Sequence, residues 1–111
     1  MFAAIGLVFG LAACAPAKLD MSNVTAVIDV RTPAEYAEGH LDGALNLDVN
    51  AADFHERVMQ LDPAGKYIVY CKSGNRAGAA IEMMTSMNFT DLTNAGGIAN
   101  AAVVTGLAIV Q

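Results

Sequence analysis

One short segment of the chain, residues 71–76 (CKSGNR), combines a cysteine with a glycine and two basic residues. The thiolate is the nucleophilic form of a cysteine, yet a free thiol with a pKa of about 8.5 is mostly protonated at neutral pH. Backbone N–H groups curled around the sulfur and the positive end of a following helix dipole would both stabilise the thiolate. We therefore expect Cys71 to act as a nucleophile that its own loop activates.

The rest of the segment suits an anionic substrate. Gly74 permits backbone angles that other residues avoid and leaves space for a donor to approach. Lys72 and Arg76 add positive charge, and the forked guanidinium of Arg76 can bind sulfonate-like oxygens. The candidate substrate-binding residues are therefore Lys72, Ser73, Gly74, Asn75 and Arg76. The alternative is a buried structural cysteine at a strand end, and the neighbouring glycine and cations argue against it.

Strands are predicted by four short segments of apolar and β-branched residues. They cover residues 24–30, 44–49, 66–70 and 90–93. The third, KYIVY, is apolar enough to lie at the centre of a sheet. Because helical segments separate the strands, we expect an α/β domain with a central parallel sheet of four to five short strands and helices on both faces. Ligands gather beyond the carboxyl ends of such strands, where the loop of Cys71 begins.

Helices are predicted between these strands. Thr32 as N-cap, Pro33 at the first helical position and Glu35 three residues after the cap form a capping box. That helix should end near Glu38. Apolar spacing and glycine turns predict three more helices, at residues 50–61, 77–87 and, after the Gly96-Gly97 turn, 98–104.

Length and charge limit the possible functions. A chain of 111 residues, 55% of them hydrophobic, has enough apolar material for one domain with one core. Its formal net charge of −5 and its six Lys and Arg residues provide no basic stripe for a phosphate backbone. We therefore expect no nucleic-acid partner.

The apolar run at the start of the sequence indicates an exported protein, although no Lys or Arg precedes Cys14 as the positive region of a signal peptide usually does. Residues 1–13 (MFAAIGLVFGLAA) form an uncharged apolar run that is shorter than the roughly 20 residues of a transmembrane helix, and they are predicted to be a signal peptide. The end of the run with Cys14, LAAC, resembles the lipobox of bacterial lipoproteins, in which the cysteine accepts diacylglycerol. We expect lipidation at Cys14, a tether at residues 14–23 and a domain at residues 24–111. An N-terminal core helix is the alternative.

Four motifs in this order resemble the rhodanese-like domain family from about Val24 to Val110. They are residues 28–31 (IDVR), 35–44 (EYAEGHLDGA), 70–77 (YCKSGNRA) and 94–98 (NAGGI). Within the family, the chain is most similar to the small single-domain periplasmic sulfurtransferases of the phage-shock type. The resemblance implies a fold whose opening strand and helix are missing or reduced. The family often has a Trp after the Gly-Gly turn, where this chain has Ala101.

The resemblance implies a thiosulfate sulfurtransferase (rhodanese). Cys71 would take the outer sulfur of thiosulfate or a similar small anionic donor as a persulfide, release sulfite, and pass the sulfur to cyanide or a thiol. No metal or organic cofactor is implied. We expect a monomer of the bacterial periplasm or cell envelope that meets the membrane only through a lipid on Cys14.

Three other matched residues have less direct roles. Asp29 and Arg31 are possible supporting residues of the site, and the favoured interpretation is that they fix loops through hydrogen bonds and an ion pair. His40 is interpreted as structural, because a persulfide mechanism needs no separate base once the thiolate exists.

Other functions of the same cysteine stay open. Phosphatases and arsenate reductases of this fold use a Cys-x5-Arg loop, which is one residue longer than the spacing from Cys71 to Arg76, and the shorter spacing favours sulfur. A non-enzymatic relay module would hand the persulfide directly to a protein. A redox sensor would form a sulfenic acid on the same sulfur.

Overall fold

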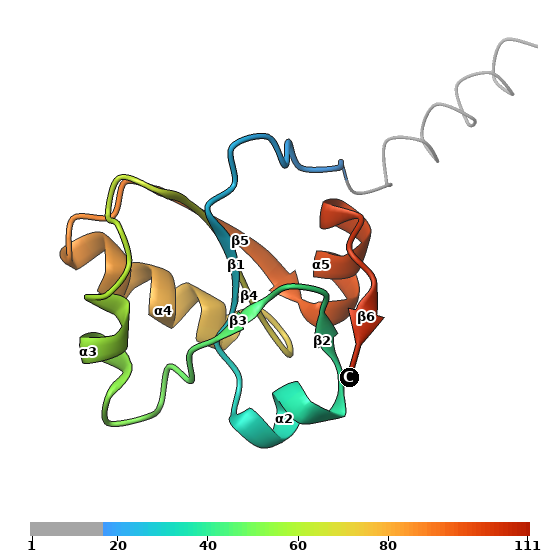
Figure 1. Cartoon of the computed structure of the whole chain (residues 1–111), viewed down its shortest axis with the longest axis horizontal. Helices are drawn as coiled ribbons and strands as arrows, with labels where there is room; N and C mark the ends of the chain where they lie inside the picture. Colours follow the sequence, from blue (N-terminus) through green and yellow to red (C-terminus); the bar gives the residue numbers. More distant parts are fainter. Residues whose placement is uncertain (1–16) are drawn as a thin grey trace, which may run out of the picture.

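The computed structural model describes residues 17–111, and a four-stranded parallel sheet forms its centre (Figure 1). The strand order is β3-β1-β4-β5. The strands are β1 (Ala26–Asp29), β3 (Leu45–Asn46), β4 (Lys66–Cys71) and β5 (Asp91–Gly97). Two further strands, β2 (His40–Leu41) and β6 (Ile109–Val110), form a separate antiparallel pair. The predicted parallel α/β architecture is therefore confirmed, with β1 and β4 as the inner strands.

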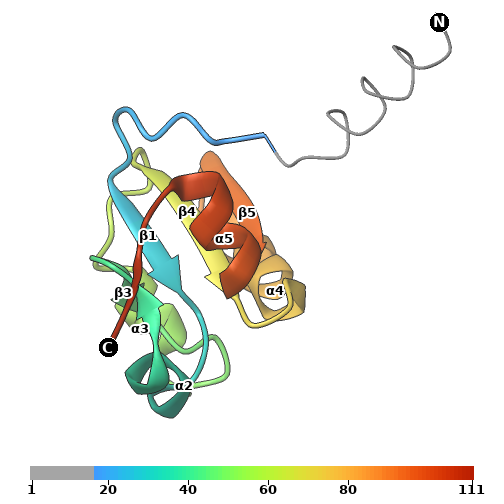
Figure 2. The ribbon, with the colours of Figure 1, turned by 90° about the vertical axis from the view of Figure 1, so that its right-hand side faces the viewer.

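Helices cover both faces of the sheet. They are α2 (Pro33–Glu38), α3 (Phe54–Val58), α4 (Asn75–Ser86) and α5 (Ile98–Thr105). Figures 1 and 2 show α3 and α4 on one side of the sheet and α5 on the other. None of the helices within residues 17–111 has the length and apolar character that crossing a bilayer would require.

The alternation of side chains along β4 divides the core into two clusters. Tyr67, Val69 and Cys71 pack with α3 and α4 on one face, whereas Ile68 and Tyr70 pack with α5 on the other. This register points the side chain of Cys71 toward the face that carries α4. Ala101, which stands where the family often has a Trp, is fully buried in the second cluster.

The observed boundaries of several elements differ from the predicted ones. The strand predicted at 44–49 is reduced to β3, and the helix predicted at 50–61 is reduced to α3 with turns on either side. β5 continues through Gly96-Gly97, which was predicted to be a turn, because Gly97 still pairs with Cys71 after an irregularity in the register. α4 begins at Asn75 rather than at residue 77, so Arg76 lies in its first turn.

The described part of the predicted tether lies against the domain. The backbone N–H of Leu19 donates to the carbonyl of Val104 at 2.8 Å, and Leu19 and Met21 pack on the cluster beside α5. The ammonium of Lys66 donates to the carbonyls of Asp20 and Ser22. The predicted signal peptide and Cys14 lie outside the described residues.

Candidate active site

Cys71 is the last residue of β4 and lies at the carboxyl end of this inner strand. Its side chain is buried, and its sulfur accepts a hydrogen bond of 2.8 Å from the backbone N–H of Gly74. The chain turns through Lys72 and Ser73 to reach Gly74, which is the N-cap of α4. The sulfur therefore lies between a strand end and a helix start, as the sequence predicted, and one of the expected main-chain donors, the N–H of Gly74, is directed at it.

Two glycines allow this turn to form. Gly74 has a φ of +101°, in the left-handed region that residues with a Cβ avoid. Gly97 lies against the same loop from β5, and a Cβ at Gly97 would collide with the carbonyl oxygen of Lys72. The Gly-Gly segment thus forms one wall of the loop that carries the nucleophile.

Asn94 joins this wall to the loop. Its side-chain amide nitrogen donates to the carbonyl of Gly74 at 3.4 Å, and its amide oxygen accepts from the N–H of Gly96 at 2.8 Å. In the sequence, Asn94 belongs to a family motif but no role for it was predicted. The structure places it as a bridge between β5 and the start of α4.

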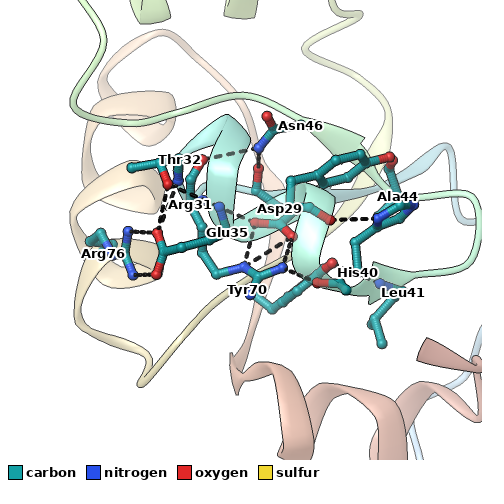
Figure 3. Close-up of polar contacts among 12 residues, drawn as sticks. Asp29, Arg31, Thr32, Glu35, His40, Leu41, Ala44, Asn46, Tyr70 and Arg76 are labelled. Atoms are coloured by element: carbon teal, nitrogen blue, oxygen red, sulfur yellow. Dashed lines mark hydrogen bonds and ion pairs between the residues drawn. The ribbon is translucent and has the colours of Figure 1, made fainter. Parts of the chain in front are cut away.

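Arg76 binds Glu35 in a bidentate ion pair (Figure 3). The Nη1 to Oε1 distance is 2.7 Å and the Nη2 to Oε2 distance is 3.0 Å. These hydrogen bonds are the main cause that lowers the pKa of Glu35 from 4.5 to about 2, and they also raise the pKa of Arg76. The sequence predicted a substrate-binding role for Arg76 and only a capping role for Glu35. The two predictions concern residues that the fold brings together.

The capping box of α2 holds Glu35 from its other side. The N–H and the hydroxyl of Thr32 each donate to Oε1 of Glu35 at 3.1 Å, and the N–H of Glu35 donates to the hydroxyl of Thr32 at 3.2 Å. The capping box predicted from Thr32, Pro33 and Glu35 is confirmed in full. The carboxylate that caps α2 is therefore the same one that binds Arg76.

Asp29, the last residue of β1, and Arg31 form a buried ion pair. The Nη2 of Arg31 lies 2.7 Å from Oδ2 of Asp29, and it also donates to the carbonyl of Gly39 at 2.6 Å. The hydrogen bond to Asp29 is the main cause that raises the pKa of Arg31. The side-chain amide of Asn46 donates to the carbonyls of Asp29 and Arg31 (Figure 3). These contacts agree with the interpretation that the pair fixes the loops around β1.

Other polar residues near α2 have structural partners. The Nδ1 of His40 lies 2.8 Å from the carbonyl of Tyr36, and its ring stacks on the Tyr36 ring at 3.6 Å, which agrees with a structural histidine. The hydroxyl of Tyr70 accepts from the N–H of Leu41 at 2.9 Å, a link that the sequence did not indicate. Burial is the main cause that raises the pKa of Tyr70.

The remaining predicted site residues surround the loop. The side chains of Lys72, Ser73 and Asn75 are exposed to solvent. The two ion pairs found in the described part of the chain involve Arg31 and Arg76, and neither includes Lys72. Among residues 17–111, no cluster of three or more His, Cys, Asp or Glu side chains has a geometry that could hold a metal ion.

Comparison with known proteins agrees with this fold and motif order. Residues 12–102 match the family model for the rhodanese-like domain. The thiosulfate sulfurtransferase PspE of Escherichia coli (strain K12) is 33% identical over 75 residues, which cover 68% of this chain and 72% of PspE. The thiosulfate sulfurtransferase GlpE of Pseudomonas fluorescens (strain SBW25) is 36% identical over 72 residues, which cover 64% of this chain and 63% of GlpE.

A solved structure gives the same result in three dimensions. A rhodanese with anions from E. coli superposes with a TM-score of 0.63 at 30% sequence identity, and the match covers 78% of this chain and 96% of that chain. The four motifs, the parallel sheet and the family match together confirm the predicted resemblance. The chain belongs to the rhodanese-like domain family.

Proposed function

We propose that this chain is a sulfurtransferase in which Cys71 carries the transferred sulfur. One observation carries the proposal: the sulfur of Cys71 lies at the carboxyl end of an inner parallel strand and accepts the N–H of Gly74 at 2.8 Å. The similarity to relatives named thiosulfate sulfurtransferases supports the same reaction and supports thiosulfate as the donor.

The first step forms a persulfide. The thiolate of Cys71 attacks the outer sulfur of thiosulfate, the sulfur–sulfur bond of the donor breaks, and sulfite leaves with the bonding electron pair. The transferred sulfur then carries the negative charge at the end of the Cys71 side chain. The N–H of Gly74 and the positive end of the α4 dipole lie where they stabilise negative charge on sulfur.

The second step regenerates the cysteine. A thiolate or cyanide attacks the outer sulfur of the persulfide, and Cys71 leaves as a thiolate. The product is a new persulfide or thiocyanate, and the protein returns to its starting state. Sulfur is carried as a covalent group on Cys71, so the proposed cycle uses no metal or organic cofactor.

A mass measurement with thiosulfate tests the proposal. We expect the wild-type protein and the control variant Cys14→Ser to release sulfite and to gain one sulfur atom per chain, whereas Cys71→Ser should do neither. A wild-type protein that releases no sulfite and gains no sulfur would overturn the proposal. A persulfide that forms but reacts with neither cyanide nor small thiols would instead favour the relay function.

We also infer that the protein is exported and held at a membrane through a lipid on Cys14. The apolar run of residues 1–13 and the LAAC segment support this inference. Fractionation of cells that express Cys14→Ser tests it, because this variant should move from the membrane fraction to the soluble periplasmic fraction. A Cys14→Ser protein that stays with the membrane would remove the lipid anchor from the proposal.

A further inference from the structure

Two of the arginines assigned to the site, Arg76 and Arg31, are paired with carboxylates. Arg76 gives the Nη1–Nη2 edge of its guanidinium to Glu35, and Arg31 is paired with Asp29. Both members of the Arg76–Glu35 pair are about a quarter exposed, at 26% and 24% of their side chains. Lys72 is exposed, and neither of the two ion pairs found within residues 17–111 includes its ammonium group.

The pairing of Arg76 with Glu35 affects how strongly the site attracts an anionic sulfur donor. Thiosulfate carries two negative charges and must approach a thiolate that carries a third. Further negative charge acts on Arg76 from Cys71 and Asp48, beside that of Glu35. An arginine that is already neutralised by a bidentate carboxylate offers little net attraction to a dianion.

The fold keeps Glu35 on Arg76. Its Oε1 accepts from the N–H and the hydroxyl of Thr32 as well as from Nη1 of Arg76, so the capping box fixes the carboxylate in place. The pair joins α2 to the first turn of α4, 41 positions apart in the chain. A sulfur donor that took the place of Glu35 on Nη1 and Nη2 of Arg76 would have to displace a carboxylate that also accepts from the N–H and the hydroxyl of Thr32.

On the basis of the proposed function, we propose that Glu35 is a positioning residue that neutralises the charge of Arg76 and thereby makes the site discriminate against donors with two negative charges. The favoured class is a sulfane-sulfur donor with a single negative charge. A matched pair of probes exists for this comparison, because methanethiosulfonate is a monoanion with the same reactive sulfur–sulfur bond as thiosulfate. Attack by the Cys71 thiolate on its outer sulfur forms the same persulfide and expels methanesulfinate with the bonding electron pair.

The test compares kcat and KM for both donors in the wild type, Glu35→Gln and Glu38→Gln. Glutamine at position 35 keeps the capping-box pattern, so the substitution removes charge while retaining the cap. Glu38→Gln removes the same charge from an exposed position of the same helix and is the matched control. Thermal unfolding of each variant verifies that it is folded.

We expect Glu35→Gln to lower KM about fivefold for thiosulfate and about twofold for methanethiosulfonate, because the released charge of Arg76 attracts a dianion more strongly. The difference between the two donors in the change of KM should shrink at high ionic strength, because salt screens electrostatic attraction. Glu38→Gln should leave both KM values unchanged. A Glu35→Gln variant that keeps the wild-type ratio of the two KM values, or that loses only kcat, would overturn the inference.

Arg76→Gln gives an independent result. This variant leaves the charge of Glu35 unbalanced, so it should raise KM for thiosulfate more than for methanethiosulfonate. The double variant Glu35→Gln/Arg76→Gln should have a KM between those of the two single variants. A double variant as impaired as Arg76→Gln would show that Arg76 binds the donor directly, which overturns the inference.

The outcomes separate this inference from the proposed function. A wild-type protein that takes sulfur from neither donor would overturn the proposed function, and this inference with it. A wild-type protein that takes sulfur from both donors, with the same preference as Glu35→Gln, would overturn this inference alone.

Discussion

Gly97 lies directly against the backbone of Lys72, the residue that follows the nucleophile, and a Cβ at Gly97 would collide with the Lys72 carbonyl oxygen. In the sheet, Gly97 is also the partner of Cys71. The end of β5 therefore determines where the turn after Cys71 can run. Any side chain at this position must push the loop away from the sheet.

The first prediction follows from this contact. Gly97→Ala should shift the loop of Cys71 and reduce the rate of persulfide formation by about tenfold or more, while overpacking lowers the free energy of unfolding by about 1–3 kcal/mol. Stopped-flow measurement of sulfite release and urea unfolding would measure both effects. The control is Gly78→Ala in α4, where a Cβ would meet only the Asn94 amide nitrogen, at 3.9 Å. Wild-type rates in Gly97→Ala would contradict the prediction.

The buried ion pair predicts a large loss of stability. Arg31→Met leaves Asp29 buried without its partner, which should cost about 3–5 kcal/mol in the free energy of unfolding. Arg57→Met, at an exposed position of α3, should cost less than about 0.5 kcal/mol. Urea unfolding curves of the two variants test this difference. Equal losses in the free energy of unfolding would show that the ion pair contributes little to stability.

The pH dependence of Glu35 can be predicted from its ion pair. The folded pKa of about 2 lies below the ordinary value of 4.5, so the pairing stabilises the fold fully above pH 4.5 and is lost as the pH falls toward 2. An NMR titration of the Glu35 carboxyl carbon should give a midpoint near 2 in the wild type. Arg76→Gln should raise this midpoint toward 4.5, whereas the exposed-site control Arg57→Gln should not. An unchanged midpoint in Arg76→Gln would contradict the assigned cause.

The capping box leads to a fourth prediction. Thr32→Ala removes the hydroxyl that accepts from the N–H of Glu35 and donates to its carboxylate, which should cost about 0.5–2 kcal/mol of stability. Thr90→Ala, at an exposed position between α4 and β5, is the control and should change little. Thermal unfolding measures the stability of both variants. Equal melting temperatures would show that the cap contributes no measurable stability.

Features encoded within a few residues were predictable from the sequence. The capping box needs only Thr32, Pro33 and Glu35, and the turn at Cys71 needs only a β-branched strand, a glycine and a helix start. Both follow from local backbone preferences, so their position in the chain could be read directly. The buried register of β4 follows in the same way from an apolar run that suits an inner strand.

Contacts between distant segments were not predictable. β2 and β6 pair with each other although they lie far apart in the sequence. Each has only two residues, which is too short for a periodic pattern. The hydrogen bonds from Arg76 to Glu35 and from Leu41 to the Tyr70 hydroxyl likewise depend on packing that only the folded chain brings about. The substrate role of Arg76 remained a prediction for this reason, since its charge was known but its partner was not.

The contacts of residues 19–22 with the domain place this segment at one end of β4. The ammonium of Lys66, at the first residue of β4, binds the carbonyls of Asp20 and Ser22, whereas Cys71 is at the last residue of the same strand. At about 3.3 Å per residue, these two ends are roughly 16 Å apart. The segment that leads into the domain therefore lies at one end of β4, and the buried sulfur of Cys71 lies at the opposite end, away from residues 19–22.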